Sequence, residues 1–417
     1  MPITLVITIV AFLSAALFVA KVLKFPKNIW LLFLAQPLAI SASPALVFIG
    51  GILGSQLAPD PKLATLPLTT MILGVASTSI PAALLARRWG RKYAALTGFS
   101  FSFIGAVLAM FAAIHSLFWL LIAASFCVGI NLSFVQQLRF AAIESVPDGG
   151  DTTKAISVLM FAGIFAAFLG PEIAVIGRDW IDAPHGYAGS FALLAIMVLA
   201  AMLVMLNFEE PQLVETVTEG ETRPLLDIVK QPIFIISIIS GAAGYSLMSL
   251  LMTATPISMH NMQGHGLNET KWVIQSHISA MYLPSLITPW LSRRFGLHHL
   301  LMAGSVMLII VSIVALSGQQ VMHYWVTLVL LGVGWNFLFL SATILLPQSY
   351  RNAERHKVQA TNDFMIFFVQ GLSSLLAGWL LFATSWQTLV YTGMPMVLLV
   401  LMSSVYYYRN RSKLSLV

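Results

Sequence analysis

Long apolar segments fill most of this chain and constrain its fold more than any other feature. About thirteen stretches of roughly twenty mostly apolar residues follow one another, and a helix of that length crosses the hydrocarbon core of a bilayer. The composition agrees, since 58% of the 417 residues are hydrophobic, 9% are charged and the mean hydropathy is +0.87. So few polar residues cannot cover a soluble globule of this size. We therefore predict a polytopic membrane protein.

The predicted fold class is all-α. Backbone amides must be paired inside hydrocarbon, so the crossing segments are either helices or strands of a closed barrel. Apolar runs of this length without strict alternation exclude a barrel. The predicted spans are residues 3–20, 29–57, 64–86, 93–113, 117–142, 155–177, 187–207, 232–257, 270–291, 297–317, 322–347, 359–384 and 386–408.

Basic residues gather on alternate connections between these spans, and cytoplasmic loops are the ones that retain positive charge. One set of connections holds nearly all Lys and Arg, including the loop at 87–92 and the C-terminal tail. The opposite set holds only Lys62, Arg178 and Lys271. We therefore predict a multi-pass protein of a bacterial inner membrane with a cytoplasmic C-terminus. This asymmetry explains the net charge of +6 without a nucleic-acid partner.

The ends and the single cysteine add two expectations. Cys127 lies inside a span, which excludes a disulfide framework or a Cys-based metal site, and no metal or cofactor is predicted. The first segment lacks a basic leader, and Phe18 stands where a small residue would precede signal cleavage after Ala20. Residues 1–25 are therefore predicted to form an extra N-terminal membrane helix.

The chain carries an internal repeat. Leu-Ala-Arg-Arg-Trp-Gly-Arg-Lys at 85–92 is matched by Leu-Ser-Arg-Arg-Phe-Gly-Leu-His at 291–298, and Gly-Ile-Asn at 129–131 by Gly-Trp-Asn at 334–336. Gly90 and Gly296 are expected to turn the chain with positive φ. The predicted organisation is a six-helix bundle at 26–207, a cytoplasmic linker at 208–231, a second six-helix bundle at 232–408 and a cytoplasmic tail at 409–417. Duplicated bundles around a midplane site are typical of secondary transporters.

The first repeat resembles the loop motif of the major facilitator superfamily, Gly-x-x-x-Asp-Arg-x-Gly-Arg-Arg/Lys. Ala83 and Arg87 depart from the motif, and the resemblance covers everything except residues 1–25. The matching positions are Arg88, Gly90, Arg91 and Lys92. The resemblance implies a cytoplasmic gate in which Arg88 or Arg91 pairs with Asp363, at the start of the eleventh core helix.

A second motif bears on the direction of transport. Proton-driven drug exporters of the superfamily carry Gly-x-x-x-Gly-Pro-x-x-Gly-Gly in the fifth core helix, of which this chain keeps only Gly170 and Pro171. Ala166, Ala174 and Val175 replace the other glycines. The decayed motif favours import over drug export.

Polar residues inside spans are costly and therefore mark candidate sites. The resemblance implies that the first, fourth, seventh and tenth core helices line a central cavity. The candidate substrate-binding residues on them are Gln36, Ser43, Asn131, Arg139, Tyr245, Met248 and Asn336. Arg139 would hold a carboxylate or phosphate, or would instead snorkel to headgroups or pair with Glu144. The stripe around Tyr245 and Met248 equally suits helix packing.

Glu172 and His277 are the candidate proton-coupling residues. They fall at similar depth on the fifth and eighth core helices, and a Glu–His pair would bind a proton near the range in which imidazole titrates. The alternative is that Glu172 hydrogen-bonds within its own half.

The leading functional prediction is a monomeric secondary transporter that imports a small organic solute, anionic or amphipathic, by proton-coupled alternating access. Efflux by a proton-coupled antiporter is the first alternative. A membrane-embedded enzyme acting on lipid is the second, and His298 with His299 is too sparse a cluster to support it. A channel is disfavoured because a twofold duplicated monomer does not obviously build a selectivity ring, and no phosphate-binding loop for ATP is present.

Overall fold

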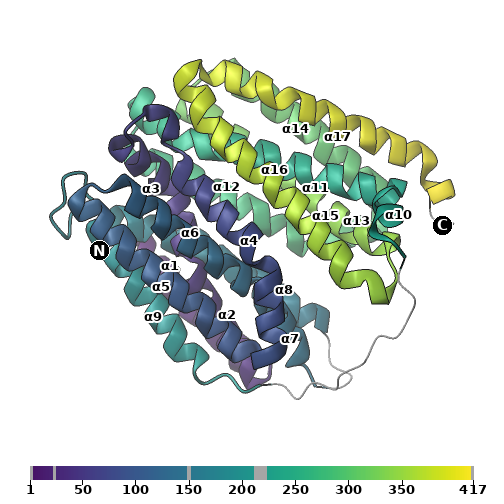
Figure 1. Ribbon diagram of the computed structural model, residues 1–417, viewed down its shortest axis with the longest axis horizontal. Helices are drawn as coiled ribbons and strands as arrows, with labels where there is room; N and C mark the ends of the chain where they lie inside the picture. Colours follow the sequence, from purple (N-terminus) through teal and green to yellow (C-terminus); the bar gives the residue numbers. More distant parts are fainter. Residues whose placement is uncertain (1–2, 22–24, 148–151, 211–222, 415–417) are drawn as a thin grey trace. The chain divides into compact units, whose positions relative to one another are not determined.

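All regular structure in this protein is helical within the part of the chain that the structure describes. The computed structural model describes residues 3–21, 25–147, 152–210 and 223–414 (Figure 1). Among these described residues, ten helical segments are long and apolar enough to cross a membrane, and shorter apolar helices lie at 5–21 and 161–176. The predicted all-α membrane fold is therefore confirmed.

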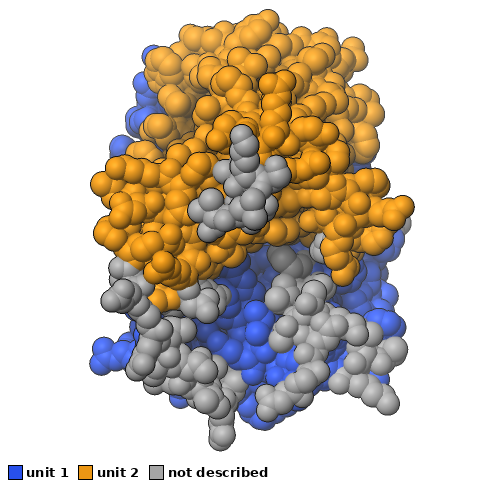
Figure 2. Space-filling view, turned by 90° about the vertical axis from the view of Figure 1, so that its right-hand side faces the viewer, with its two compact units in different colours: residues 1–214, 266–275 blue, residues 215–265, 276–417 orange. Residues whose placement is uncertain are grey.

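Contacts divide the chain into two compact units (Figure 2). Unit 1 is residues 1–214 with 266–275, and unit 2 is residues 215–265 with 276–417. The helices of unit 1 are α1 (Ile3–Lys21), α2 (Lys27–Ile40), α3 (Ala42–Leu57), α4 (Leu66–Trp89), α5 (Arg91–His115), α6 (Phe118–Val135), α7 (Leu138–Glu144), α8 (Thr152–Ile176) and α9 (Ala188–Met205). Those of unit 2 are α10 (Leu225–Val229), α11 (Pro232–Pro256), α13 (Thr288–Phe295), α14 (Leu297–Ser317), α15 (Val321–Leu345), α16 (Arg355–Ala383) and α17 (Trp386–Leu414). The helix α12 (Leu267–Tyr282) begins in unit 1 and ends in unit 2.

The two units share one packing pattern, as a duplicated chain requires. In unit 1, α5 packs against α6 and α9, and α2 packs against α8 and α9. In unit 2, α14 packs against α15 and α17, and α11 packs against α16 and α17. These are the same pairs when the core helices of each unit are counted in chain order. The internal repeat read from the sequence is thus a structural repeat.

Two predicted spans are interrupted at or beside prolines, and a third is extended by a π-helix. The span 29–57 breaks at Ser41 into α2 and α3, because Pro44 lacks the N–H that would bond to the carbonyl of residue 40. The span 270–291 breaks at a 3₁₀ turn, Leu283–Leu286, which contains Pro284. Beyond Pro256, α11 continues as a π-helix, Ile257–Met262. Each break exposes backbone groups that a continuous helix would satisfy.

The extra helix α1 packs on unit 1 through aromatic side chains. Phe12 lies 5.2 Å from Phe165 of α8 and 6.0 Å from Phe33 of α2, measured between ring centroids. Other apolar side chains of α1, among them Ile7 and Val10, are exposed, as lipid contact requires.

Gly90 and Gly296 have the positive φ expected of them. Their φ values are 91° and 82°, and their ψ values are 167° and 153°. Each glycine ends one helix and starts the next, between α4 and α5 and between α13 and α14. This region of backbone space is almost restricted to glycine.

Replacing either glycine with alanine is expected to destabilise the protein by about 1–3 kcal/mol, because a Cβ strains this conformation. At Gly90 the added Cβ would also lie 2.5 Å from Glu210 Oε1. Thermal unfolding in detergent measures the loss. Gly264→Ala is the control for φ alone, since its φ is +70° and no atom lies within 4 Å of its Cβ position. A Gly90→Ala variant no less stable than wild type would contradict the structural role of the turn.

Candidate functional site

A buried ion pair joins α8 to the first half of α12 within unit 1. Glu172 is 1% exposed, and its Oε1 lies 3.0 Å from the ammonium of Lys271, whose side chain is 11% exposed. The amide of Gln275 donates to Phe168 O at 3.3 Å and to Glu172 Oε1 at 3.4 Å. Glu172 Oε2 has no hydrogen-bond partner among the residues that the structure describes. The carboxylate therefore has one cation, one neutral donor and one oxygen left without a donor.

The predicted pairing of Glu172 with His277 is replaced by this arrangement. Lys271 and Gln275 are four residues apart, so they project about 40° from one another and share a face of α12. His277 lies about 200° round from Gln275, and its Nδ1 is 2.6 Å from Leu328 O on α15. The two candidate coupling residues thus have different partners, and sequence analysis missed Lys271 and Gln275. The signal was available, because Lys271 was one of three basic residues on connections otherwise almost free of them.

Asn131 is buried and Gln36 is half-buried in unit 1, and the side chain of each donates to a backbone carbonyl. The amide of Asn131 donates to Ala39 O at 3.0 Å, two residues before the break at Ser41 between α2 and α3. The amide of Gln36 donates to Leu159 O on α8 at 3.2 Å. Ser43 is half-buried in the first turn of α3. Within the described part of the chain, Asn131 Oδ1 is buried without a partner and remains able to accept a hydrogen bond.

Arg139 is not on the helix that carries Asn131. A tight turn at 136–137 separates α6 from α7, so the phase calculated for one continuous helix does not apply. The Arg139 side chain is exposed, and its guanidinium lies 4.8 Å from the centroid of the Phe140 ring. Glu144, one of the alternatives considered for its partner, contacts the Arg91 guanidinium through both carboxylate oxygens.

Tyr245 lies in an aromatic cluster of unit 2. Its ring is edge-on to Trp335 at 5.2 Å, to Phe339 at 5.4 Å and to Phe367 at 5.8 Å. Met248, one turn along α11, is buried. Sequence analysis proposed Tyr245 but missed the other three rings, because α15 and α16 each carry several aromatic residues and only the packing of the helices decides which of them meet.

Asn336 holds the helix break between α12 and α13. Its amide donates to Met281 O at 2.7 Å and to Ser285 Oγ at 2.6 Å, and its Oδ1 accepts from Thr288 at 3.1 Å. These bonds satisfy polar groups that the break exposes. Asn131 does the same for the break after Ala39, so the repeated Gly-x-Asn places an amide beside a broken helix in each unit.

The loop motif binds acidic residues of its own unit. The Arg91 guanidinium contacts both oxygens of Glu144, at 2.8 and 2.5 Å, and Gln137 Oε1 at 3.3 Å. The backbone N–H groups of Arg91 and Lys92 donate to the Glu210 carboxylate at 3.0 and 2.6 Å, which caps the N-terminus of α5. Arg91 is therefore engaged by Glu144.

The other predicted members of the cytoplasmic gate, Arg88 and Asp363, belong to different units, and their pairing stays a prediction. Arg88 is exposed, and half-buried Asp363 accepts from the side chain of Asn362 at 3.1 Å. Asp363 lies in the ninth position of α16 rather than at its start.

The segment ends that flank residues 211–222 are each bound to their own unit. In unit 1, Lys27 Nζ lies 2.7 Å from Glu209, and this hydrogen bond lowers the pKa of Glu209. In unit 2, the Arg223 guanidinium contacts both oxygens of buried Glu354, at 2.9 and 2.7 Å. Hydrogen bonding to Arg223 lowers the pKa of Glu354 well below its ordinary value. The amide of Arg351 adds a bond of 2.8 Å.

The Arg223–Glu354 pair predicts a defined pH dependence of stability. Because the folded pKa of Glu354 is below its ordinary value of 4.5, its stabilisation is complete above about pH 4.5 and is lost as the pH falls through the folded pKa. Near neutral pH, Glu354→Gln should destabilise by about 2 kcal/mol. The difference from wild type should shrink on acidification, as measured by thermal unfolding. Glu209→Gln, on an exposed pair, should differ little from wild type at either pH, and a Glu354→Gln deficit that grows with acid would contradict the assignment.

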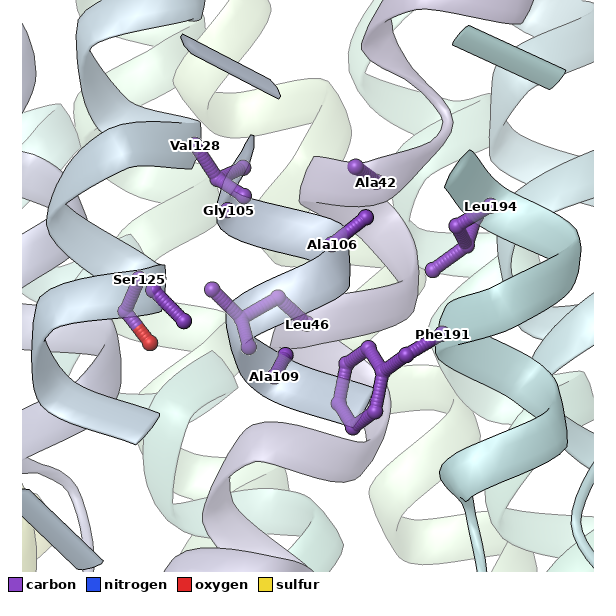
Figure 3. Close-up of a pocket in the computed structure, with 10 residues that line it drawn as sticks. Ala42, Leu46, Gly105, Ala106, Ala109, Ser125, Val128, Phe191 and Leu194 are labelled. Carbon is purple, nitrogen blue, oxygen red and sulfur yellow. The ribbon is translucent and has the colours of Figure 1, made fainter. Parts of the chain in front are cut away.

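A small pocket in unit 1 does not suit a polar solute, because its lining is almost entirely apolar (Figure 3). Apolar side chains from α3, α5, α6 and α9 line it, together with Ser125. The Ser125 hydroxyl donates to Leu121 O in its own helix at 2.7 Å, so it is not available to a solute. Among the described residues, no three His, Cys, Asp or Glu side chains form a potential metal site.

Two duplicated helical units, broken helices and buried polar groups define a transport protein of the membrane rather than an enzyme. The comparison with known sequences agrees, because the profile of the Major Facilitator Superfamily matches residues 29–358. This chain belongs to the major facilitator superfamily.

Individual relatives are transporters. The riboflavin transporter RfnT of Brucella anthropi (strain ATCC 49188) is 36% identical over 377 residues, which cover 90% of this chain and 94% of that protein. A solved structure of a point mutant of the nucleoside transporter NupG superposes with a TM-score of 0.71 at 13% identity, covering 91% of this chain and 99% of that one. A POT family transporter in complex with 5-aminolevulinic acid gives a TM-score of 0.72 at 11% identity, covering 94% and 97%. At these identities the two structures show the fold alone.

Proposed function

We propose that this protein imports riboflavin, or a solute with a similar planar ring system, by proton-coupled secondary transport. The observation that carries the proposal is the identity of 36% to RfnT across 90% of this chain and 94% of that protein. Riboflavin is neutral, so the solute needs no cation such as Arg139. The decay of the exporter motif around Gly170 supports import.

Glu172 is the proposed site of coupling. A proton on its carboxylate would remove the charge that attracts Lys271, and the first half of α12 would then separate from α8 at a lower cost. Loss of the proton would restore the pair. The burial of Glu172 and its contact with the Lys271 ammonium support this role, because the attraction between the two groups depends on the charge of the carboxylate. His277 is a less direct candidate for coupling, since its Nδ1 is hydrogen-bonded to the carbonyl oxygen of Leu328.

The proposal includes a location, an orientation and an assembly state. Basic residues on one set of connections favour the bacterial inner membrane with the C-terminus inside. The predicted bundles at 26–207 and 232–408 would alternate access to a site near the midplane, within a monomer. Gln36, Ser43, Asn131, Met248 and Asn336 stay candidates for the walls of that site.

Uptake in a riboflavin-auxotrophic bacterium without a riboflavin importer of its own tests the proposal. Expression of this chain should restore growth at low external riboflavin and should produce saturable uptake of labelled riboflavin, which collapses with a protonophore. Vector-only cells are the control. Uptake equal to the vector control, with the protein present in the membrane, would overturn the proposal. Faster loss of preloaded riboflavin from the expressing cells would overturn import in favour of efflux.

A further inference from the structure

Four aromatic side chains meet near mid-depth of unit 2. Tyr245 lies near the middle of α11, Trp335 near the middle of α15 and Phe367 near the middle of α16, and Phe339 lies four residues beyond Trp335. In membrane bundles of this kind, solute sites lie close to the bilayer midplane. The cluster therefore occupies the depth at which a transported solute is held.

The rings are arranged as a stack with an edge-on ring beside it. Trp335 and Phe339 are one turn apart on α15, and their rings are nearly parallel, with centroids 4.9 Å apart and an interplanar angle of 12°. Tyr245 meets both at 85° and 88°, and meets Phe367 at 70°. Stacked and edge-to-face contacts are the two arrangements that aromatic rings prefer, so this cluster offers both kinds of contact to a flat ring system.

The indole N–H of Trp335 distinguishes this cluster from an ordinary packed core. Trp335 is 5% exposed, and its Nε1 has no hydrogen-bond partner among the described residues. Buried tryptophans usually find an acceptor, and a leucine or phenylalanine would fill the same space without an unpaired donor. Tyr245, Phe339 and Phe367 are each only half-buried, so the cluster is not sealed.

We propose that Tyr245, Trp335, Phe339 and Phe367 bind the flat heteroaromatic ring of the solute, and that the Trp335 N–H donates to a ring nitrogen or carbonyl oxygen. The inference rests on the proposed function for the claim that a planar solute is carried. It adds the residues and the part of the solute that they recognise. A polyol chain alone has no face to stack and would not bind here.

Selectivity follows from the same geometry. Stacking tolerates many flat rings, because each has a π-face. The buried Trp335 N–H, however, gains a hydrogen bond only from a ring with an acceptor in reach, and stays unpaired beside any other ring. The site should therefore prefer rings edged with nitrogen or carbonyl groups to hydrocarbon rings of equal size.

Binding to the purified full-length chain in detergent tests the site. The probes are lumichrome, a flat heteroaromatic ring system without a polyol chain, and ribitol, a polyol without a ring. Isothermal titration should show lumichrome binding that ribitol does not compete with. Trp335→Leu should weaken lumichrome binding at least about tenfold, by loss of both stacking and the donor. Trp335→Phe, which keeps a ring and loses only the N–H, should fall between Trp335→Leu and wild type.

A matched control separates the site from general effects of losing a tryptophan. Trp379 on α16 is 48% exposed, and Trp379→Leu should bind lumichrome as wild type does. Thermal unfolding checks that each variant is folded. Equal lumichrome affinity in folded Trp335→Leu and wild type would overturn the inference, as would wild-type protein that binds ribitol but not lumichrome.

The inference and the proposed function fail separately. Wild-type cells that take up no riboflavin, together with purified protein that binds lumichrome through Trp335, would contradict the transported solute and support the ring site. Riboflavin uptake with the same KM in Trp335→Leu and wild type would contradict the ring site and leave the proposed solute intact.

Discussion

Lys271→Ala is expected to destabilise the protein by about 3–5 kcal/mol, which is the cost of leaving one partner of a buried ion pair uncompensated. Glu172 is 1% exposed, and its Oε2 already lacks a donor, so removal of the ammonium 3.0 Å away leaves Gln275 as its remaining hydrogen-bond donor. The first half of α12 is held to unit 1 by these contacts. Thermal and denaturant unfolding in detergent would measure the loss.

The double variant is the informative control. Glu172→Gln combined with Lys271→Met removes both charges, and neutral replacement of a buried pair is often harmless or stabilising. It should therefore recover most of the stability that Lys271→Ala loses. Lys62→Ala, at an exposed lysine, should change stability little. A Lys271→Ala variant as stable as Lys62→Ala would contradict the energetic importance of the pair.

Glu172→Gln is expected to abolish proton-driven accumulation of solute while leaving exchange across the membrane. An amide can neither take up nor release a proton, so the gradient could no longer do work at this position. Accumulation should fall to the level seen with a protonophore. This is a loss of about tenfold or more when Glu172 provides most of the coupling to the proton gradient. Counterflow, which needs no net proton movement, should continue.

Glu269→Gln provides the matched comparison. Glu269 is an exposed carboxylate two residues before Lys271, and its side chain caps the backbone N–H of Gly266 at 2.8 Å. A glutamine can accept the same bond, so accumulation should persist. Normal accumulation by Glu172→Gln would remove Glu172 from the coupling mechanism, and coupling would then need another protonatable group.

Features that depend on local chemistry were predictable from the sequence. Helix class and the order of the spans follow from apolar length, and the positive φ of Gly90 and Gly296 follows from their place in repeated turns. The internal repeat predicted that the two units would share one pattern of helix packing. The breaks at Ser41 and at Leu283–Leu286 were not predicted, although Pro44 and Pro284 stand beside them, because a proline inside a membrane helix can either kink it or interrupt it.

Features that depend on which side chains meet were less predictable. The partner of Glu172 was expected to be His277, since both lie at similar depth, but depth alone does not fix which face of α12 turns towards α8. Arg139 was assigned an angular position on a helix that the turn at 136–137 interrupts. Trp335 was missed because its distinctive feature, a buried donor without an acceptor, exists only after folding.

The most direct test of the account is solute accumulation in proteoliposomes that contain only this protein. With an inward proton gradient and labelled riboflavin outside, the vesicles should accumulate riboflavin above its external concentration, and a protonophore should abolish the excess. Vesicles made with Glu172→Gln should only equilibrate. Accumulation that is unaffected by the protonophore, or riboflavin levels that match those of protein-free vesicles, would contradict a proton-coupled importer of this solute.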